Sequence, residues 1–251
     1  MRISPASFPS MLDGARIGIV GAGRLGAAVA SALRAAGLEV VGPLGRGASG
    51  GGCDIVYLCV PDAEIAPAAR MIQAGRLVGH ASGATSLAPL APHEAFSAHP
   101  LLSISKAGAT FVGAGCAVAG TTERARSAAF ELATVLGMRP FSISDDDRRL
   151  YHAAASLASN YFVALEGAAE RLFADCGVSR DYVVPLVQSA LDHWADVGAR
   201  EALTGPVVRG DDDTVARQRD ALASRAPALI PLWDVMTATT RALAREPAST
   251  R

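Results

Sequence analysis

The sequence has no surplus of charge of either sign. Its 23 basic and 24 acidic residues leave a formal net charge of -1. A chain with so little net charge has no electrostatic attraction to nucleic acid or to an anionic membrane. We therefore expect neither as a partner.

Long apolar runs are also missing. The most apolar later stretch, residues 151–169, contains His152, Asn160 and Glu166 and consists largely of small residues, so it does not suit a membrane span. The N-terminus carries Arg2 followed by serines and prolines in place of the apolar core of a secretory signal. We expect a short frayed tail there and a cytoplasmic protein.

Cysteine and histidine lack the spacing of metal or redox sites. The four cysteines are scattered without a C-x-x-C pair, which predicts buried free thiols; they are Cys53, Cys59, Cys116 and Cys176. No two of the five histidines stand four residues apart with an acid between them, so we expect no metal.

What is present is the pattern of a two-domain α/β chain. The 251 residues are 50% hydrophobic and 19% charged, which suits a compact core and excludes a disordered chain. Up to about residue 145, apolar strands alternate with helices, and from Leu150 onward only helices are predicted. We predict a Rossmann-like doubly wound sheet over residues 1–146 and a smaller all-α domain over 147–251. In the first, 117–119 and 140–143 are expected as edge strands.

A dinucleotide-binding fingerprint begins the first domain. The apolar strand that ends at Val20 runs directly into Gly21-x-Gly23-x-x-Gly26 and then into a helix. The three glycines would allow a tight turn, the approach of a pyrophosphate and close packing of helix on strand. The N–H groups at the helix start, from Arg24, Leu25 and Gly26, would then hold the phosphate. The alternative is a glycine turn that only packs the helix on the sheet.

The second strand favours NADP over NAD. An NAD enzyme usually carries an acid near the end of that strand for the ribose hydroxyls. Here Glu39 stands at its start, and no acid follows before Arg46. Arg46, with Ser49, could hold a 2′-phosphate through its planar fork of donors. The alternative is that Arg46 is an ordinary solvated charge.

Polar loops follow the next predicted strands, where a doubly wound fold places its ligands. After strand 54–60, Val60 and Pro61 are a candidate cover for the cofactor, although Pro61 could simply end the strand and Asp62 cap a helix. After strand 77–79, His80 is a candidate cofactor contact. Ser82 and Gly83 would offer a hydroxyl and a backbone amide to a substrate, unless Ser82 is only a turn residue.

His99 follows the next predicted strand, 95–98, and is a candidate substrate contact. The alternative for both His80 and His99 is a structural hydrogen bond or a place beside the nicotinamide.

The first helix of the second domain carries a polar stripe. His152, Ser156 and Asn160 recur at i, i+4 and i+8 of a helix expected from Asp147 to Cys176. The functional interpretation is that His152 donates a proton while Ser156 and Asn160 orient the substrate oxygen. The alternative is hydrogen bonding between the domains, with His152 a core histidine.

A polar loop lies further along, before a helix expected to begin near Thr214. It contains Thr204 and Arg209, and Arg209 could clamp the carboxylate of an acidic substrate through two parallel hydrogen bonds. The alternative is an ion pair between Arg209 and Asp211 or Asp213.

Several of these motifs, in this order, resemble one family. They are Gly21-Ala22-Gly23-Arg24-Leu25-Gly26, His80-Ala81-Ser82-Gly83, His99-Pro100-Leu101, Tyr151-His152 through Asn160-Tyr161, and Leu203-Thr204-Gly205-Pro206 with Arg209-Gly210-Asp211. The sequence is similar to the bacterial family with a Rossmann-like N-terminal domain and a C-terminal domain of unknown function. That family is distantly similar to ketopantoate reductases, pyrroline-5-carboxylate reductases and β-hydroxyacid dehydrogenases.

The resemblance implies an oxidoreductase with an all-α domain over the nicotinamide and a homodimer built through that domain. Some members are regarded as an alternative ketopantoate reductase of pantothenate synthesis. Ordinary ketopantoate reductases carry a catalytic lysine followed by asparagines at i+4 and i+8, and here only Asn160 matches that pattern.

We therefore expect an NADPH-dependent reductase of a small 2-oxo acid, with ketopantoate as the first substrate to try. Alternatives are a cyclic-imine or β-hydroxyacid oxidoreductase, and a noncatalytic NADP-binding protein.

Overall fold

The computed structural model describes residues 11–105 and 108–247. The predicted N-terminal tail lies mostly outside these residues. Contacts divide the chain into two compact units, a sheet unit that ends at Asn160 and a helical unit that begins at Tyr161.

The sheet unit contains one seven-stranded sheet in the order β2-β1-β3-β4-β5-β6-β7. Its strands are β1 (Arg16–Val20), β2 (Glu39–Leu44), β3 (Ile55–Leu58), β4 (Leu77–His80), β5 (Glu94–Leu101), β6 (Gly115–Gly120) and β7 (Arg139–Ser142). All neighbours are parallel except β5 and β6. The prediction of a Rossmann-like sheet is confirmed. β6 is not an edge strand as expected, because β7 pairs with its outer side.

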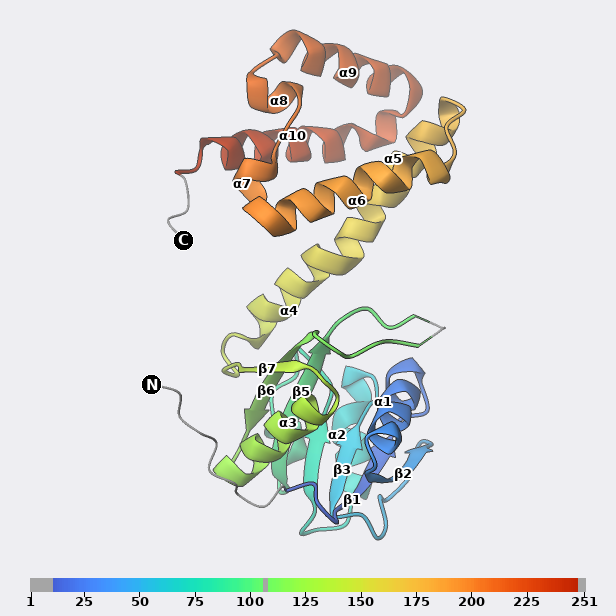
Figure 1. The fold of residues 1–251 in the computed structure, drawn as a ribbon, viewed down its shortest axis with the longest axis vertical. Helices are drawn as coiled ribbons and strands as arrows, with labels where there is room; N and C mark the ends of the chain where they lie inside the picture. The colour runs from blue at the N-terminus through green and yellow to red at the C-terminus, as the bar shows by residue number, and fades with distance from the viewer. Residues whose placement is uncertain (1–10, 106–107, 248–251) are drawn as a thin grey trace. The chain divides into compact units, whose positions relative to one another are not determined.

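Helices cover both faces of this sheet (Figure 1). On one face α1 (Arg24–Ala35) and α3 (Glu123–Val135) pack on alternate strand residues such as Ile19, Tyr57 and Phe96. On the other face α2 (Asp62–Met71) and the short η1 (Ala88–Leu90) pack on the intervening residues, such as Val56, Leu58 and Val78. Burying each such aliphatic or aromatic side chain contributes about 1.5–3 kcal/mol. The two apolar layers fix the strand ends that carry the loops.

The helix predicted from Asp147 to Cys176 is interrupted. It consists of α4 (Arg148–Ser156), a π-helical turn η2 (Leu157–Tyr161) and α5 (Phe162–Asp175). The two compact units meet within the π turn, whereas the boundary expected from sequence, 146/147, stands at the start of α4. α4 therefore belongs with the sheet that it contacts.

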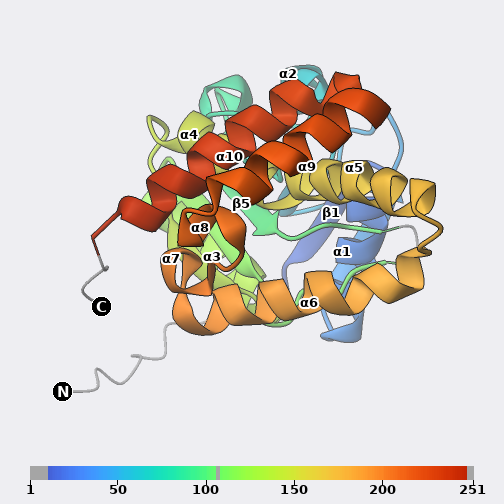
Figure 2. The ribbon, with the colours of Figure 1, turned by 90° about the horizontal axis from the view of Figure 1, so that it is seen from above.

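The helical unit has no strand among its described residues. After α5 come α6 (Arg180–Val197), α7 (Ala199–Ala202), α8 (Pro206–Arg209), α9 (Asp212–Arg225), η3 (Pro227–Leu229) and α10 (Ile230–Arg245). α9 and α10 lie side by side (Figure 2). α9 begins two residues earlier than expected, because the Asp211 carboxylate accepts a hydrogen bond from the Thr214 amide and caps the helix.

Three further sequence expectations concern cysteines, metals and membranes. Cys53, Cys59 and Cys116 are buried free thiols as predicted, but Cys176 is exposed, because it caps the surface end of α5. Within residues 11–105 and 108–247, no three His, Cys, Asp or Glu side chains gather as a metal site would need. No helix in the same ranges combines the length and the apolarity needed to cross a bilayer.

Candidate active site and nucleotide site

The glycine loop between β1 and α1 has the close packing that its spacing predicts. Gly21 has φ +117°, and a Cβ there would overlap the Cys59 carbonyl. A Cβ at Gly26 would overlap the Gly21 carbonyl oxygen. At Gly23 a Cβ would meet nothing within 4 Å, so this position faces open space. Two of the glycines are therefore needed for packing, and the third leaves the approach to the backbone clear.

The start of α1 suits an anion. Gly23 is the N-cap and no side chain caps the helix, while its first turn contains no acidic residue. The first amides of a helix have no partner within it, and here they belong to Arg24, Leu25 and Gly26. The Arg24 side chain is already engaged within the protein, because its Nη1 donates a hydrogen bond to the Ile104 carbonyl at 3.1 Å.

A cavity of about 420 Å³ opens beside this loop. It is lined by the end of β1, by the loops after β1, β2 and β3, and by α2: Val20, Gly21, Ala22, Gly23, Gly45, Arg46, Gly47, Ala48, Cys59, Val60, Pro61, Glu64, Pro67, Ala68 and Met71. The predicted cofactor contacts Arg46, Val60 and Pro61 are thus brought together with the glycine loop, and Ser49 is not. We call this the nucleotide cavity.

The nucleotide cavity is lined by one basic and one acidic side chain, Arg46 and Glu64. The Arg46 side chain is 86% exposed, and its Nη2 lies 3.8 Å from Glu64 Oε1, a surface pair too loose to fix it. Glu39 begins β2 and pairs with Arg16 at 2.7 Å, so its carboxylate lies at the other end of that strand. Among the described residues, Glu39 therefore does not line the cavity, and Arg46 and Glu64 are the charged side chains that do.

A second cavity, of about 640 Å³, lies where β5 ends. It is lined by His99, Pro100, Leu101, Leu102, Ser103, Tyr151, His152, Ala154, Ala155, Ser156, Ala158, Ser159 and Asn160. Four predicted residues therefore share one cavity, which we call the catalytic cavity: His99, His152 and Ser156 of α4, and Asn160 of the π turn. His99 belongs to β5 itself and not to a loop after it, because β5 continues to Leu101 in its pairing with β6.

Two histidine rings and a tyrosine meet in the catalytic cavity. His99 Nδ1 lies 2.7 Å from the Tyr151 hydroxyl, and the rings of His99 and His152 have centroids 6.2 Å apart. His152 is exposed, so it is not a core histidine. The Ser156 hydroxyl donates to the His152 carbonyl at 3.1 Å, which leaves only its lone pairs for a ligand.

Gly83 lies against the rings of His99 and His152. A Cβ at this position would lie 2.9 Å from Cε1 and Nδ1 of His99 and 3.1 Å from Cδ2 of His152. Its φ is not in the positive range, so space and not backbone conformation requires the glycine. Gly83 is thus brought to the catalytic cavity as expected, in contact with its two histidines.

The Ser82 hydroxyl holds the loop that contains Gly83. It donates to Asp62 Oδ2 at 2.9 Å and accepts from the amides of Ala84 and Thr85 at 3.2 and 2.9 Å. With these bonds made, the hydroxyl has no remaining hydrogen for a substrate. The turn-residue interpretation of Ser82 fits the structure better than the substrate-binding one.

His80 is also used within the protein. Its ring is fully buried, Nδ1 accepts from the Ser82 amide at 3.2 Å, and Nε2 lies 3.1 Å from the Ser86 carbonyl. Burial lowers the pKa of His80, which keeps the ring neutral. Because both ring nitrogens are occupied, we revise the expected cofactor contact to a structural role in the loop.

Two residues of this region escaped the sequence analysis. Arg148 is 1% exposed; it donates through Nε to Asp145 and through Nη2 to Ser97, both at 2.6 Å. The sequence pattern that could have indicated this ion pair is an acid, Asp145, three residues before Arg148 at the start of a helix. Tyr151 precedes His152 and so lies off the stripe, and its contact with His99 joins residues 52 positions apart.

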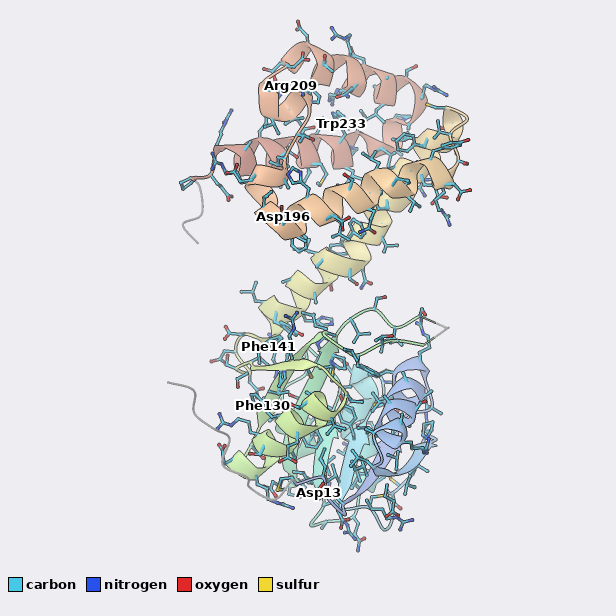
Figure 3. All side chains as sticks on the ribbon, viewed as in Figure 1. Asp13, Phe130, Phe141, Asp196, Arg209 and Trp233 are labelled. Atoms are coloured by element: carbon cyan, nitrogen blue, oxygen red, sulfur yellow. The ribbon has the colours of Figure 1, made fainter. Side chains whose placement is uncertain are left out.

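The polar loop of the helical unit is exposed. Thr204 and Arg209 are both exposed, with Arg209 at the end of α8 (Figure 3). Within the described ranges, Arg209 makes no ion pair with Asp211 or Asp213, because the Asp211 carboxylate caps α9 instead.

The fold and the two cavities define a class: a two-unit protein with a Rossmann-like sheet, a glycine-lined cavity at the carboxyl ends of its parallel strands, and a helical second unit. Residues 114–240 match the family described as a domain of unknown function, DUF2520, and the chain belongs to that family. The family resemblance predicted from the motifs is confirmed.

Solved structures share this fold over most of their length. A Bacteroides fragilis protein provisionally assigned as an NADP oxidoreductase has a TM-score of 0.78 at 17% identity, covering 91% of this chain and 98% of that one. A protein of Thermotoga maritima has a TM-score of 0.73 at 23% identity, with the same coverage. Pyrroline carboxylate reductase of Plasmodium falciparum, solved with NADP bound, has a TM-score of 0.59 at 12% identity, covering 93% and 99%. No curated protein matches the sequence.

Proposed function

We propose that this protein is an NADPH-dependent reductase of a small 2-oxo acid, with ketopantoate as the first substrate to try. The observation that carries the proposal is the position of the two cavities. The nucleotide cavity follows β1, β2 and β3, and the catalytic cavity follows β5, so both lie at the carboxyl edge of the parallel strands. A dinucleotide bound across that edge would place its reactive end near the histidines.

The residues of the nucleotide cavity fit NADPH. The amides at the start of α1 suit the pyrophosphate, and Arg46, which follows β2, suits a 2′-phosphate. The acid of β2, Glu39, stands at the far end of that strand, and the acid that lines the cavity, Glu64, belongs to α2. Fold neighbours named as NADP oxidoreductases or solved with NADP bound support the same cofactor.

NADPH supplies a hydride for the substrate carbonyl carbon. A residue of the chain must then supply the proton that completes the hydroxyl group of the product. We assign His152 to protonate the oxygen, because its exposed imidazole opens into the catalytic cavity. The Asn160 amide would donate to the same oxygen, whereas Ser156, whose hydrogen is committed, would accept from a donor group of the substrate. Arg209 remains our proposed partner of the carboxylate.

A cyclic imine is the second candidate substrate. It is supported by the fold neighbour that is a pyrroline carboxylate reductase. The same proton donor would then serve a nitrogen in place of an oxygen.

The proposal is tested by screening 2-oxo acids and cyclic imines for NADPH oxidation. His152→Ala should lower kcat about 10²- to 10⁴-fold, the usual contribution of general acid catalysis, with NADPH affinity unchanged. His193→Ala on the exposed face of α6 is the matched control. Bound NADPH without turnover of any compound would favour a noncatalytic protein.

We also propose a homodimer formed through the helical unit. Large apolar side chains are exposed on its helices: Tyr182, Val184, Leu186, Leu191 and Trp194 on α6, and Leu232, Val235 and Met236 on α10. Exposed apolar surface of this extent is typical of protein interfaces. Light scattering of the purified chain would measure the mass.

A further inference from the structure

The catalytic cavity contains two histidines, and the proposed reduction needs a proton from only one of them. His152 is exposed on α4. His99 is half-buried on β5, and its ring has a hydrogen-bond partner, the Tyr151 hydroxyl, whereas among the described residues the His152 ring has none. The difference points to different tasks for the two rings.

Tyr151 contacts one nitrogen of His99. Its hydroxyl lies 2.7 Å from Nδ1, and the rings meet edge to face with centroids 5.5 Å apart. Phe141 of β7, labelled in Figure 3, packs against the Tyr151 ring at a centroid distance of 6.0 Å. Tyr151 is therefore held by aromatic contacts from two strands, with its hydroxyl directed at His99.

The direction of this hydrogen bond sets the tautomer of His99. A phenol hydroxyl can donate or accept, and among the described residues Nδ1 of His99 is its hydrogen-bond partner, so the phenol hydrogen is bonded only if Nδ1 accepts it. A neutral imidazole carries one hydrogen, so if Nδ1 accepts, that hydrogen is on Nε2. No group within the described ranges takes up Nε2, which leaves it for a ligand of the cavity that the ring lines.

We infer that Tyr151 is a positioning residue that fixes the proton of His99 on Nε2, so that His99 donates a hydrogen bond to the substrate oxygen while His152 transfers the proton. This inference rests on the proposed function. His99 is then a catalytic residue that keeps its own hydrogen throughout.

The surroundings keep the His99 ring neutral. Burial lowers the pKa of His99 to about 4. Four further ionisable groups act on it: His152, Arg148 and His80, which also lower the pKa, and Asp62, which raises it. Burial raises the pKa of Tyr151 to about 12, so near neutral pH the pair is a phenol and a neutral imidazole.

A neutral N–H donor suits the developing charge of the reaction. As the hydride adds to the carbonyl carbon, the π electron pair moves to oxygen, and Nε2–H of His99 stabilises it there. His152 then transfers its proton to that oxygen and becomes neutral. Hydride and proton are both accounted for, and His99 returns unchanged.

The tautomer can be measured without turnover. Nitrogen-15 NMR of the histidine rings in the full chain should show His99 as the Nε2–H form near neutral pH. In Tyr151→Phe the Nδ1–H form should appear and the pKa of His99 should rise, because the lost hydroxyl stabilised the neutral ring. Tyr161→Phe, which removes the hydroxyl of an exposed tyrosine that does not line the catalytic cavity, should leave His99 unchanged. A wild-type Nδ1–H form, or a spectrum that Tyr151→Phe does not alter, would overturn the inference whatever the substrate is.

Kinetics then test whether Tyr151 acts through His99. Tyr151→Phe should lower kcat about 10-fold with little change in KM, a smaller loss than deletion of an oxyanion donor. In a His99→Leu background the same substitution should have no further effect. An equal loss in both backgrounds, with thermal melting showing both variants folded, would mean that Tyr151 acts independently of His99.

Discussion

Replacing Gly83 by alanine should misplace both histidines of the catalytic cavity while leaving the fold intact. The added methyl group would stand 2.9 Å from two atoms of His99 and 3.1 Å from His152, whereas carbon contacts are comfortable at about 3.5–4.0 Å. The rings must therefore move away by about 0.5–1 Å. Gly83 has no positive φ, so alanine adds no backbone strain.

A displacement of this size should be costly for catalysis. A 1 Å misplacement of reacting groups can cost about 10²-fold, so we expect Gly83→Ala to lower kcat by about 10²-fold. NADPH affinity should stay the same, because Gly83 does not line the nucleotide cavity. The assay is steady-state NADPH oxidation on the best substrate of the screen, with cofactor affinity measured by fluorescence titration.

The matched control is Gly51→Ala, on an exposed loop where the nearest atom, Ser49 Oγ, would lie 3.5 Å from the methyl group. Histidine NMR of both variants reports ring displacement directly. Normal turnover by Gly83→Ala, with the rings of His99 and His152 shifted, would refute the claim that their placement matters.

Four further substitutions test other parts of the two cavities and the fold. Arg46→Ala should weaken NADPH binding by about 1.5–3 kcal/mol and barely alter NADH, and equal losses in fluorescence titrations would remove Arg46 from the 2′-phosphate. Truncating Arg209 should raise KM for an acidic substrate but not for its uncharged amide, so matched changes for both compounds would make Arg209 structural. Asp145→Ala should lower the free energy of unfolding by about 2–3 kcal/mol, because it strands a buried guanidinium, and Arg148→Met should cost less, because Asp145 is 49% exposed; urea denaturation that ranks them the other way would contradict this account.

The sheet could be predicted because its signals are local. The run from Ile17 to Gly26 joins an apolar strand, a glycine turn and a helix within a few residues, and the structure has them in that order. The helical second half was predicted because no strand pattern appears after Leu150. Strand ends were less certain: β5 continues through His99 because β6 pairs with it, and that contact is not visible in the local pattern.

The candidate site could be predicted only in part. His152, Ser156 and Asn160 were found because helical spacing relates them, and they share a cavity. Tyr151 and Arg148 were missed because their partners, His99 and Ser97, are about fifty positions away in the chain. The buried bonds of His80 and Ser82 were invisible for a different reason, since a polar residue in a loop has the same sequence whether it faces a ligand or its own backbone.

The π turn brings the three residues of the polar stripe, His152, Ser156 and Asn160, closer to one line along the helix. In a regular α-helix of 3.6 residues per turn, a step of four residues overshoots a full turn by about 40°, so Asn160 would stand about 80° away from His152. Residues in a π turn rotate less per step, and the turn at Leu157–Tyr161 covers the interval from Ser156 to Asn160. Asn160 is thereby brought back toward the line of His152. Deletion of one residue from this turn would allow a continuous α-helix but would rotate the Asn160 amide out of the catalytic cavity.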